Sequence, residues 1–173
     1  DIVKACKLNE SEGVDRFSIV TAGKALSGEE FEKAVHAYET MNKECDIELC
    51  ASMGFLNAEQ LHRLHEAGVT SYHHNIETSR INFPNICTTH TYDMKIETLK
   101  LVKAEGMWAC SGGIIGMGED WEDRLDMAIS LAEVGVDSIP LNALMPIKGT
   151  PLENERRLTE PVSYTHLRAH ETR

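Results

Sequence analysis

Apolar residues along this chain alternate between the helical spacing of three to four residues and the extended spacing of two. Extended runs of apolar and β-branched residues lie at 16–20, 46–50, 69–75, 107–111 and 137–141. Helical patterns occupy 1–12, a long segment that starts at Ser27, and then 57–66, 91–105 and 119–134. The sequence therefore predicts five strands that alternate with helices.

Capping residues mark the limits of several predicted helices. Ser27 is followed three residues later by Glu30, which is the arrangement of a capping box. Asn57 stands at the start of the next helix, and Gly68 follows its end. A connection of about 15 residues leads from the third strand to the helix at 91–105, and connections of that length are usually functional.

A regular alternation of strands and helices is typical of a parallel sheet with helical crossovers. No GxGxxG motif follows the first strand, which favours a barrel over a dinucleotide-binding sheet. A complete barrel of this type has eight strands and about 250 residues. The predicted fold class is therefore α/β: a partial (β/α) TIM-type barrel with about five βα units, formed by residues 1–161 and truncated at both ends.

Composition and charge exclude several classes of protein. The net charge of −11 at pH 7 argues against a nucleic-acid surface, and no apolar run approaches the roughly 20 residues that cross a bilayer. The five cysteines are an odd number at irregular spacing. They suit a reducing cytoplasm, where cysteine serves metal binding or catalysis more often than disulfides.

The two ends of the chain differ from the rest. The chain begins at Asp1 without an initiator methionine, and residues 162–173 (VSYTHLRAHETR) have no apolar periodicity. This peptide resembles the translation of a transposase adapter used in sequencing libraries. We interpret 162–173 as adapter read-through and exclude it from the fold, so His166 and His170 are not considered as metal ligands.

Polar and sulfur-containing side chains stand at the predicted carboxyl ends of the strands, where barrels carry their active sites. Thiols there suit a soft metal or an iron–sulfur centre, and amide and carboxylate groups suit a ribose or an amino acid. Gly112 and Gly113 would let another molecule approach the backbone closely. The candidates at the strand ends are Ser18, Cys50, Asn75, Glu77, Cys110 and Asn142.

Five segments, in order and at matching spacing, resemble the biotin synthases, a family of radical S-adenosylmethionine enzymes. The resemblance extends over nearly all of residues 1–160. The segments are Glu48-Leu-Cys-Ala-Ser-Met-Gly-Phe-Leu56, Tyr72-His-His-Asn-Ile-Glu-Thr-Ser79, Thr88-Thr-His-Thr-Tyr92, Cys110-Ser-Gly-Gly-Ile-Ile-Gly-Met-Gly-Glu119 and Ser138-Ile-Pro-Leu-Asn-Ala-Leu-Met-Pro-Ile-Lys-Gly-Thr-Pro-Leu152.

The resemblance implies a specific chemistry. A [4Fe–4S] cluster reduces bound S-adenosylmethionine, and the resulting 5′-deoxyadenosyl radical removes hydrogen from dethiobiotin. An auxiliary iron–sulfur cluster, [2Fe–2S] or a variant, then donates the sulfur that makes biotin. The resemblance also implies a reducing partner such as flavodoxin or ferredoxin, and a homodimer.

The same resemblance assigns roles to individual residues. Cys50 and Cys110 match ligands of the auxiliary cluster. The other matches are Asn75 and Glu77 with the ribose of S-adenosylmethionine, Ile114 with its adenine, Gly112 and Gly113 with the cofactor-binding glycines, and Asn142 and His73 with the ureido ring of dethiobiotin.

Three departures from the family pattern affect these expectations. The CxxxCxxC motif of the radical cluster is absent from the 173 residues, so we interpret the chain as an internal fragment that is inactive by itself. Ser18 stands where many members have a cysteine ligand, and a serine alkoxide matches a soft iron–sulfur site poorly. His73 replaces an asparagine. The auxiliary cluster type and the role of Cys87, in the long connection, stay open.

Two alternatives remain at this stage. One is another radical enzyme similar to biotin synthase, such as a hydrogenase-cofactor maturase or a methylornithine synthase, although Cys50 and Cys110 speak against it. The other is a metal-free barrel used for binding or aldol-type chemistry. That barrel would need a Schiff-base lysine, and only Lys148 lies near a predicted strand end.

Overall fold

The computed structural model describes residues 1–158, and its main feature is a sheet of four parallel strands. The strands are β1 (Arg16–Val20), β2 (Glu48–Ser52), β3 (Val69–His73) and β4 (Trp108–Cys110), and they lie in that order. Each neighbouring pair is parallel. The predicted α/β class with a parallel sheet is confirmed. The read-through predicted for 162–173 lies outside the described residues.

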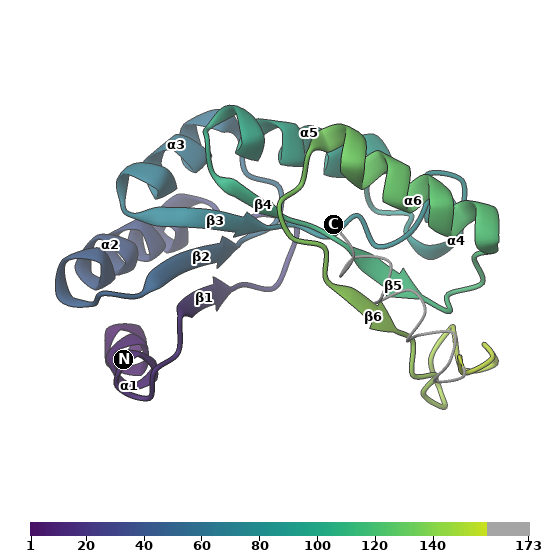
Figure 1. Cartoon of the computed structure of the whole chain (residues 1–173), viewed down its shortest axis with the longest axis horizontal. Coiled ribbons are helices and arrows are strands. Elements are labelled where there is room, and N and C mark those ends of the chain that lie inside the picture. The colour runs from purple at the N-terminus through teal and green to yellow at the C-terminus, as the bar shows by residue number, and fades with distance from the viewer. Residues whose placement is uncertain (159–173) are drawn as a thin grey trace.

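A second parallel pair extends the arc. Strand β5 (Gly113–Ile115) pairs with β6 (Leu141–Ala143). Single bridges from Glu77 to Gly113 and from Cys110 to Ser138 join this pair to the main sheet. The six strands form an arch that resembles part of a barrel wall (Figure 1).

Helices cover one side of this arch. They are α1 (Ile2–Ser11), α2 (Gly28–Glu44), α3 (Ala58–Glu66), α4 (Phe83–Ile86), α5 (Tyr92–Ala104) and α6 (Trp121–Val134). Helices α3, α5 and α6 follow the curve of the sheet on its outer side (Figure 1). Helix α4 is a single short turn inside the predicted connection. The local apolar spacing did not predict this helix.

The core lies between the helices and the outer face of the strands. Alternate strand residues point to opposite faces, so Leu49 and Tyr72 are buried against the helices. On the other face of the strands, Val20 is 72% exposed and Trp108 is 57% exposed. Within residues 1–158, that inner face thus carries exposed side chains on β1 and β4, whereas Cys50 on β2 and Ser71 on β3 are buried.

Two sequence-based expectations were wrong for identifiable reasons. The Ser27 side chain makes no capping hydrogen bond, because Gly28 has a φ of 58° and the first turn is irregular. Glu30 instead pairs with Lys33 at 2.6 Å. The strand predicted at 137–141 is displaced: Ser138 makes only a single bridge to Cys110, and β6 begins at Leu141, directly after Pro140, which has no N–H to donate. The pairing resumes at β6, and β5 was not predicted at all.

Candidate functional site

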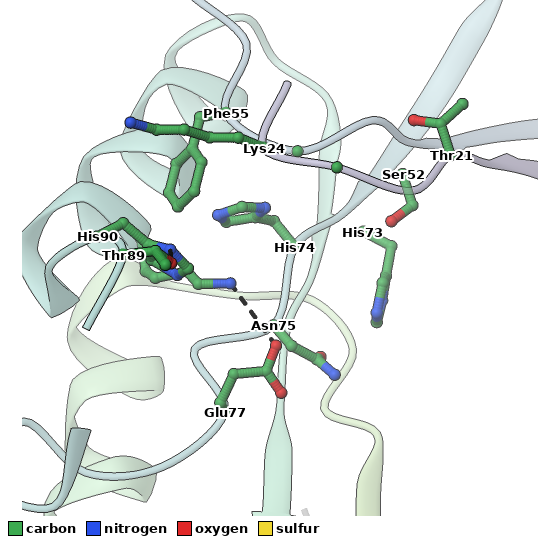
Figure 2. A pocket seen from close by; sticks show the side chains of 13 residues that line it. Thr21, Lys24, Ser52, Phe55, His73, His74, Asn75, Glu77, Thr89 and His90 are labelled. Carbon is green, nitrogen blue, oxygen red and sulfur yellow. Dashed lines mark hydrogen bonds and ion pairs between the residues drawn. The ribbon is translucent and has the colours of Figure 1, made fainter. Parts of the chain in front are cut away.

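A cavity of about 460 Å³ lies where β2 and β3 end (Figure 2). Its lining comes from the loops after β1 and β2, from the segment that continues β3, from the connection before α5, and from α5 itself. The lining includes Lys24, Phe55, His74, Asn75, Glu77 and His90. Parallel strands bring their carboxyl ends to one edge of the sheet, which is why segments distant in sequence meet here.

Two adjacent histidines of this segment face different surroundings. His74 is 5% exposed and packs against Phe55, with ring centroids 4.8 Å apart, whereas His73 points away from that group (Figure 2). Burial lowers the pKa of His74 to about 3, and the nearby Lys95 acts in the same direction. His74 is therefore neutral at pH 7, and its Nε2 has no hydrogen-bond partner among the described residues.

Glu77 and Lys95 form an ion pair in the wall of the cavity. The Lys95 Nζ lies 3.6 Å from Glu77 Oε1, and it also lies 5.4 Å from the centre of the Phe55 ring. Burial raises the pKa of Glu77 above its usual value, and the opposing charge of Lys95 offsets only part of this effect. A carboxylate with two oxygens in a cavity of this size can accept hydrogen bonds from a pair of ligand hydroxyls.

Sequence analysis missed Lys95, although its position gives a usable signal. Tyr92, Lys95, Leu99 and Val102 recur at helical spacing, and all four are buried on the same helix, α5. A lysine within such an apolar stripe is rarely buried without a partner. That rule predicts an acidic partner or a ligand nearby.

The backbone around Glu77 is held tightly by the glycine-rich segment. Among the described residues, Glu77 is the only non-glycine residue with a positive φ, 72°. Its carbonyl oxygen accepts from the N–H of Ile114 at 2.8 Å, and the Asn75 side chain accepts from the N–H of Gly112 at 3.0 Å. Strained backbone of this kind is concentrated at binding and active sites.

Gly112 and Gly113 are buried, and the chain itself occupies the space beside them. A Cβ on Gly112 would lie 1.8 Å from the carbonyl oxygen of Pro140, and one on Gly113 would lie 2.5 Å from that of Glu77. These glycines therefore permit close approach of this chain's own backbone. They act on the cavity by fixing Asn75 and Glu77, and a direct contact with a ligand stays a prediction.

The sulfur-containing candidates lie on the inner face of the sheet. Ser18 stands directly opposite Cys50 on the neighbouring strand, and His73 stands opposite Cys110. The His73 Nδ1 lies 3.2 Å from the Cys110 sulfur. Burial raises the pKa of the Cys110 thiol and lowers that of His73.

Two thiols lie on this face, Cys50 on β2 and Cys110 on β4. Within residues 1–158, no group of three His, Cys, Asp or Glu side chains converges on one point as a mononuclear site requires. An iron–sulfur cluster contains several iron atoms, so its protein ligands need not converge on one point. Cys50 and Cys110 are soft donors suited to iron.

Two other candidates are not part of the cavity lining, although Cys87 contacts two residues that are. Asn142 is in the middle of β6, opposite Ile114, and neither residue lines the cavity. Cys87 follows α4, and its sulfur contacts the hydroxyl of Thr89 at 3.4 Å and the ring of His90 at 3.5 Å. The Thr89 hydrogen bond lowers the pKa of the Cys87 thiol.

Comparison with known proteins decides the family. The sequence profile of the Radical SAM superfamily matches residues 1–131. The chain belongs to the radical SAM superfamily. This radical SAM chain is 66% identical over 158 residues to a biotin synthase of Clostridium beijerinckii, which covers 91% of the chain and 50% of that protein. A biotin synthase of Alkaliphilus metalliredigens is 58% identical over 159 residues, which covers 92% of the chain and 50% of that protein. The chain thus spans about half the length of the curated relatives it matches.

Solved structures agree on the fold of this radical SAM chain. A methylornithine synthase superimposes with a TM-score of 0.84 at 20% identity, covering 96% of this chain and 51% of that one. A maturase of the [FeFe]-hydrogenase, HydG, gives a TM-score of 0.75 at 16% identity, with 96% and 40% coverage. At these identities, the likeness shows the barrel-type fold alone. No described helix is both long and apolar enough to cross a membrane.

Proposed function

We propose that this radical SAM chain takes part in the conversion of dethiobiotin to biotin by radical sulfur insertion. The observation that carries the proposal is the 66% identity to a biotin synthase over 158 residues. The position of Cys50 on β2 and of Cys110 on β4, on the same face of one sheet, supports it, because this chemistry needs a sulfur-donating cluster inside the barrel.

S-adenosylmethionine is the proposed occupant of the cavity. Bound there, it supplies the hydrogen-abstracting radical, and an auxiliary cluster supplies the sulfur. Glu77 accepts hydrogen bonds from the ribose hydroxyls, and Asn75 offers them its amide N–H₂ while its oxygen holds Gly112. Ile114, on β5 beyond the cavity lining, is the proposed contact of the adenine, and the charge of Lys95 favours the ionised form of Glu77.

The remaining predicted roles complete the proposal. Asn142 binds the ureido ring of dethiobiotin, and Cys50 and Cys110 ligate the auxiliary cluster as thiolates. A flavodoxin or ferredoxin delivers the electron that a radical cluster needs, and the active protein is a cytoplasmic homodimer. In this proposal, residues 1–161 are the native barrel segment, and 162–173 are adapter read-through that contributes nothing to the activity. The similarity to biotin synthases supports these roles.

A segment exchange tests the function. The 158 residues of the Clostridium beijerinckii biotin synthase that match this chain are replaced by the corresponding residues of this chain. Expressed in a biotin auxotroph, the chimera should restore growth on dethiobiotin. A soluble chimera that produces 5′-deoxyadenosine but no biotin would contradict the proposal.

Replacing Cys50 by alanine in the chimera tests its predicted role as a cluster ligand. The Cys50→Ala chimera should still cleave S-adenosylmethionine but form no biotin, because only the sulfur-donating cluster loses a ligand. Cys45→Ala, which changes a cysteine outside the inner face, should restore growth like the unmodified chimera. Continued biotin formation by Cys50→Ala would show that Cys50 is not a ligand.

No specific observation favours the alternatives. Methylornithine synthase and HydG share the fold at 20% and 16% identity, far below the 66% identity to the biotin synthase. The match of the Radical SAM profile to residues 1–131 disfavours a metal-free barrel.

A further inference from the structure

Four side chains on the inner face form two pairs across neighbouring strands. Ser18 on β1 stands opposite Cys50 on β2, and His73 on β3 stands opposite Cys110 on β4. Cys50 in turn stands opposite Ser71, two residues before His73. Residues two apart on a strand share a face, so both pairs lie on the same side of the sheet.

His73 is directed at the sulfur of Cys110. Its Nδ1 lies 3.2 Å from that sulfur, whereas the adjacent His74 is directed to the other side, against Phe55 (Figure 2). The imidazole of His73 is half-buried, and its strand position places it on the same face of the sheet as Cys50 and Cys110. A nitrogen and a sulfur this close together can bind the same metal atom.

Ser18 is the weakest iron ligand among these four side chains. Its exposed hydroxyl is a hard oxygen donor opposite Cys50, and iron–sulfur clusters favour thiolate or imidazole ligands. Imidazole is an established partner of thiolate in such clusters: two histidines replace two cysteines on one iron of a Rieske centre. His73 supplies a donor of the right class, already next to a thiol.

We propose that His73 is a ligand of the auxiliary cluster and binds, through an imidazole nitrogen, the same iron as Cys110. The inference rests on the proposed function, which supplies the cluster. Cys110 releases its proton and binds as a thiolate, and His73 binds through the lone pair of its neutral ring, so no redox step is involved. His73 then belongs to the cluster and leaves the ureido ring of dethiobiotin to Asn142.

The test is to reconstitute the 173-residue chain anaerobically with iron and sulfide, with ¹⁵N-labelled histidine incorporated. Pulsed EPR of the reduced cluster should show a strongly coupled histidine nitrogen. That coupling should vanish in His73→Asn and persist in His62→Asn, which changes an exposed histidine of α3. Mössbauer spectra of the oxidised ⁵⁷Fe cluster should show one distinct iron in the wild type.

A conservative replacement separates ligation from folding. His73→Cys should retain iron and sulfide, remove the distinct iron, and shift the reduction potential to more negative values, because a thiolate stabilises the oxidised cluster more than imidazole does. A wild-type cluster with equivalent irons and no coupled histidine nitrogen would overturn the assignment, and so would failure of the chain to take up iron and sulfide. Growth of the chimera on dethiobiotin decides the proposed function separately.

Discussion

The Lys95 ammonium on α5 lies 3.6 Å from the carboxylate of Glu77, in the segment that follows β3. The lysine side chain is only 9% exposed, and that of Glu77 is 33% exposed. Two charges at this depth stabilise the fold only as a pair, because each alone would be a desolvated ion. The pair therefore ties helix α5 to the cavity wall.

Replacement of Lys95 should destabilise the chain by leaving Glu77 without its counter-ion. For Lys95→Met we expect a loss of roughly 1–2 kcal/mol in the free energy of unfolding, less than for a fully buried pair because Glu77 is partly solvated. Urea denaturation measures it. Lys4→Met is the control, since Lys4 and its partner Asp1 are exposed and should change little. Equal midpoints for both variants would contradict the structural role of Lys95.

A substitution in the glycine-rich segment should lower the free energy of unfolding by more than Lys95→Met does. A Cβ at Gly112 would lie 1.8 Å from the carbonyl oxygen of Pro140, and these two residues directly precede the paired strands β5 and β6, so a backbone shift would disturb that pairing. Gly112→Ala should therefore cost roughly 3 kcal/mol or more. Gly135→Ala, at the αL end of α6 with open space around it, should cost only about 1 kcal/mol. Similar thermal midpoints for the two variants would show that the loop relaxes.

These two sites show which features local sequence patterns can predict and which they cannot. Strand β1 was predicted with its observed limits because a short apolar run alternates there without interruption. The pairing of Lys95 with Glu77 joins two elements, and no periodicity within either one encodes it. The glycines after β4 were recognised as permitting close approach, but only the fold identifies Pro140 as the neighbour.

On the inner face, too, the sequence predicts which side chains gather but not how they contact one another. The thiols were predictable as a group because parallel strands bring their ends together. The contact of His73 with Cys110 depends on the register of β3 and β4, which the sequence pattern does not set. Asn142 was predicted to follow a strand at 137–141; it lies instead within β6, opposite Ile114, and its role stays a prediction.

Ligand binding tests the proposed role of Glu77. In the chimera with the Clostridium beijerinckii protein, Glu77→Ala should raise the KM for S-adenosylmethionine roughly tenfold to a hundredfold, because hydrogen bonds to a charged group contribute about 1.5–3 kcal/mol. The rate of 5′-deoxyadenosine formation measures it. Glu97→Ala removes an exposed carboxylate from α5 and is the matched control. An unchanged KM in Glu77→Ala would place the ribose elsewhere.

The surface contact between α3 and the end of α5 predicts a dependence of stability on pH. His62 Nδ1 lies 2.9 Å from a Glu105 carboxylate oxygen. This hydrogen bond, together with the charge of Glu105, raises the pKa of His62, and the same contact lowers the pKa of Glu105. The folded chain thus binds the His62 proton more tightly than the unfolded chain, and the charged pair stabilises the fold where both groups are ionised.

The sign of the effect follows from these two shifts. The contribution of His62 is fully present below its unfolded pKa of 6.5 and is lost as the pH rises through the higher folded value. His62→Asn should therefore lower the thermal midpoint relative to the wild type at pH 5.5 and leave it unchanged at pH 9. His36→Asn, on the exposed face of α2, controls for loss of a surface imidazole. A deficit in His62→Asn that is equal at both pH values would mean that the His62 contact acts through packing and carries no charge.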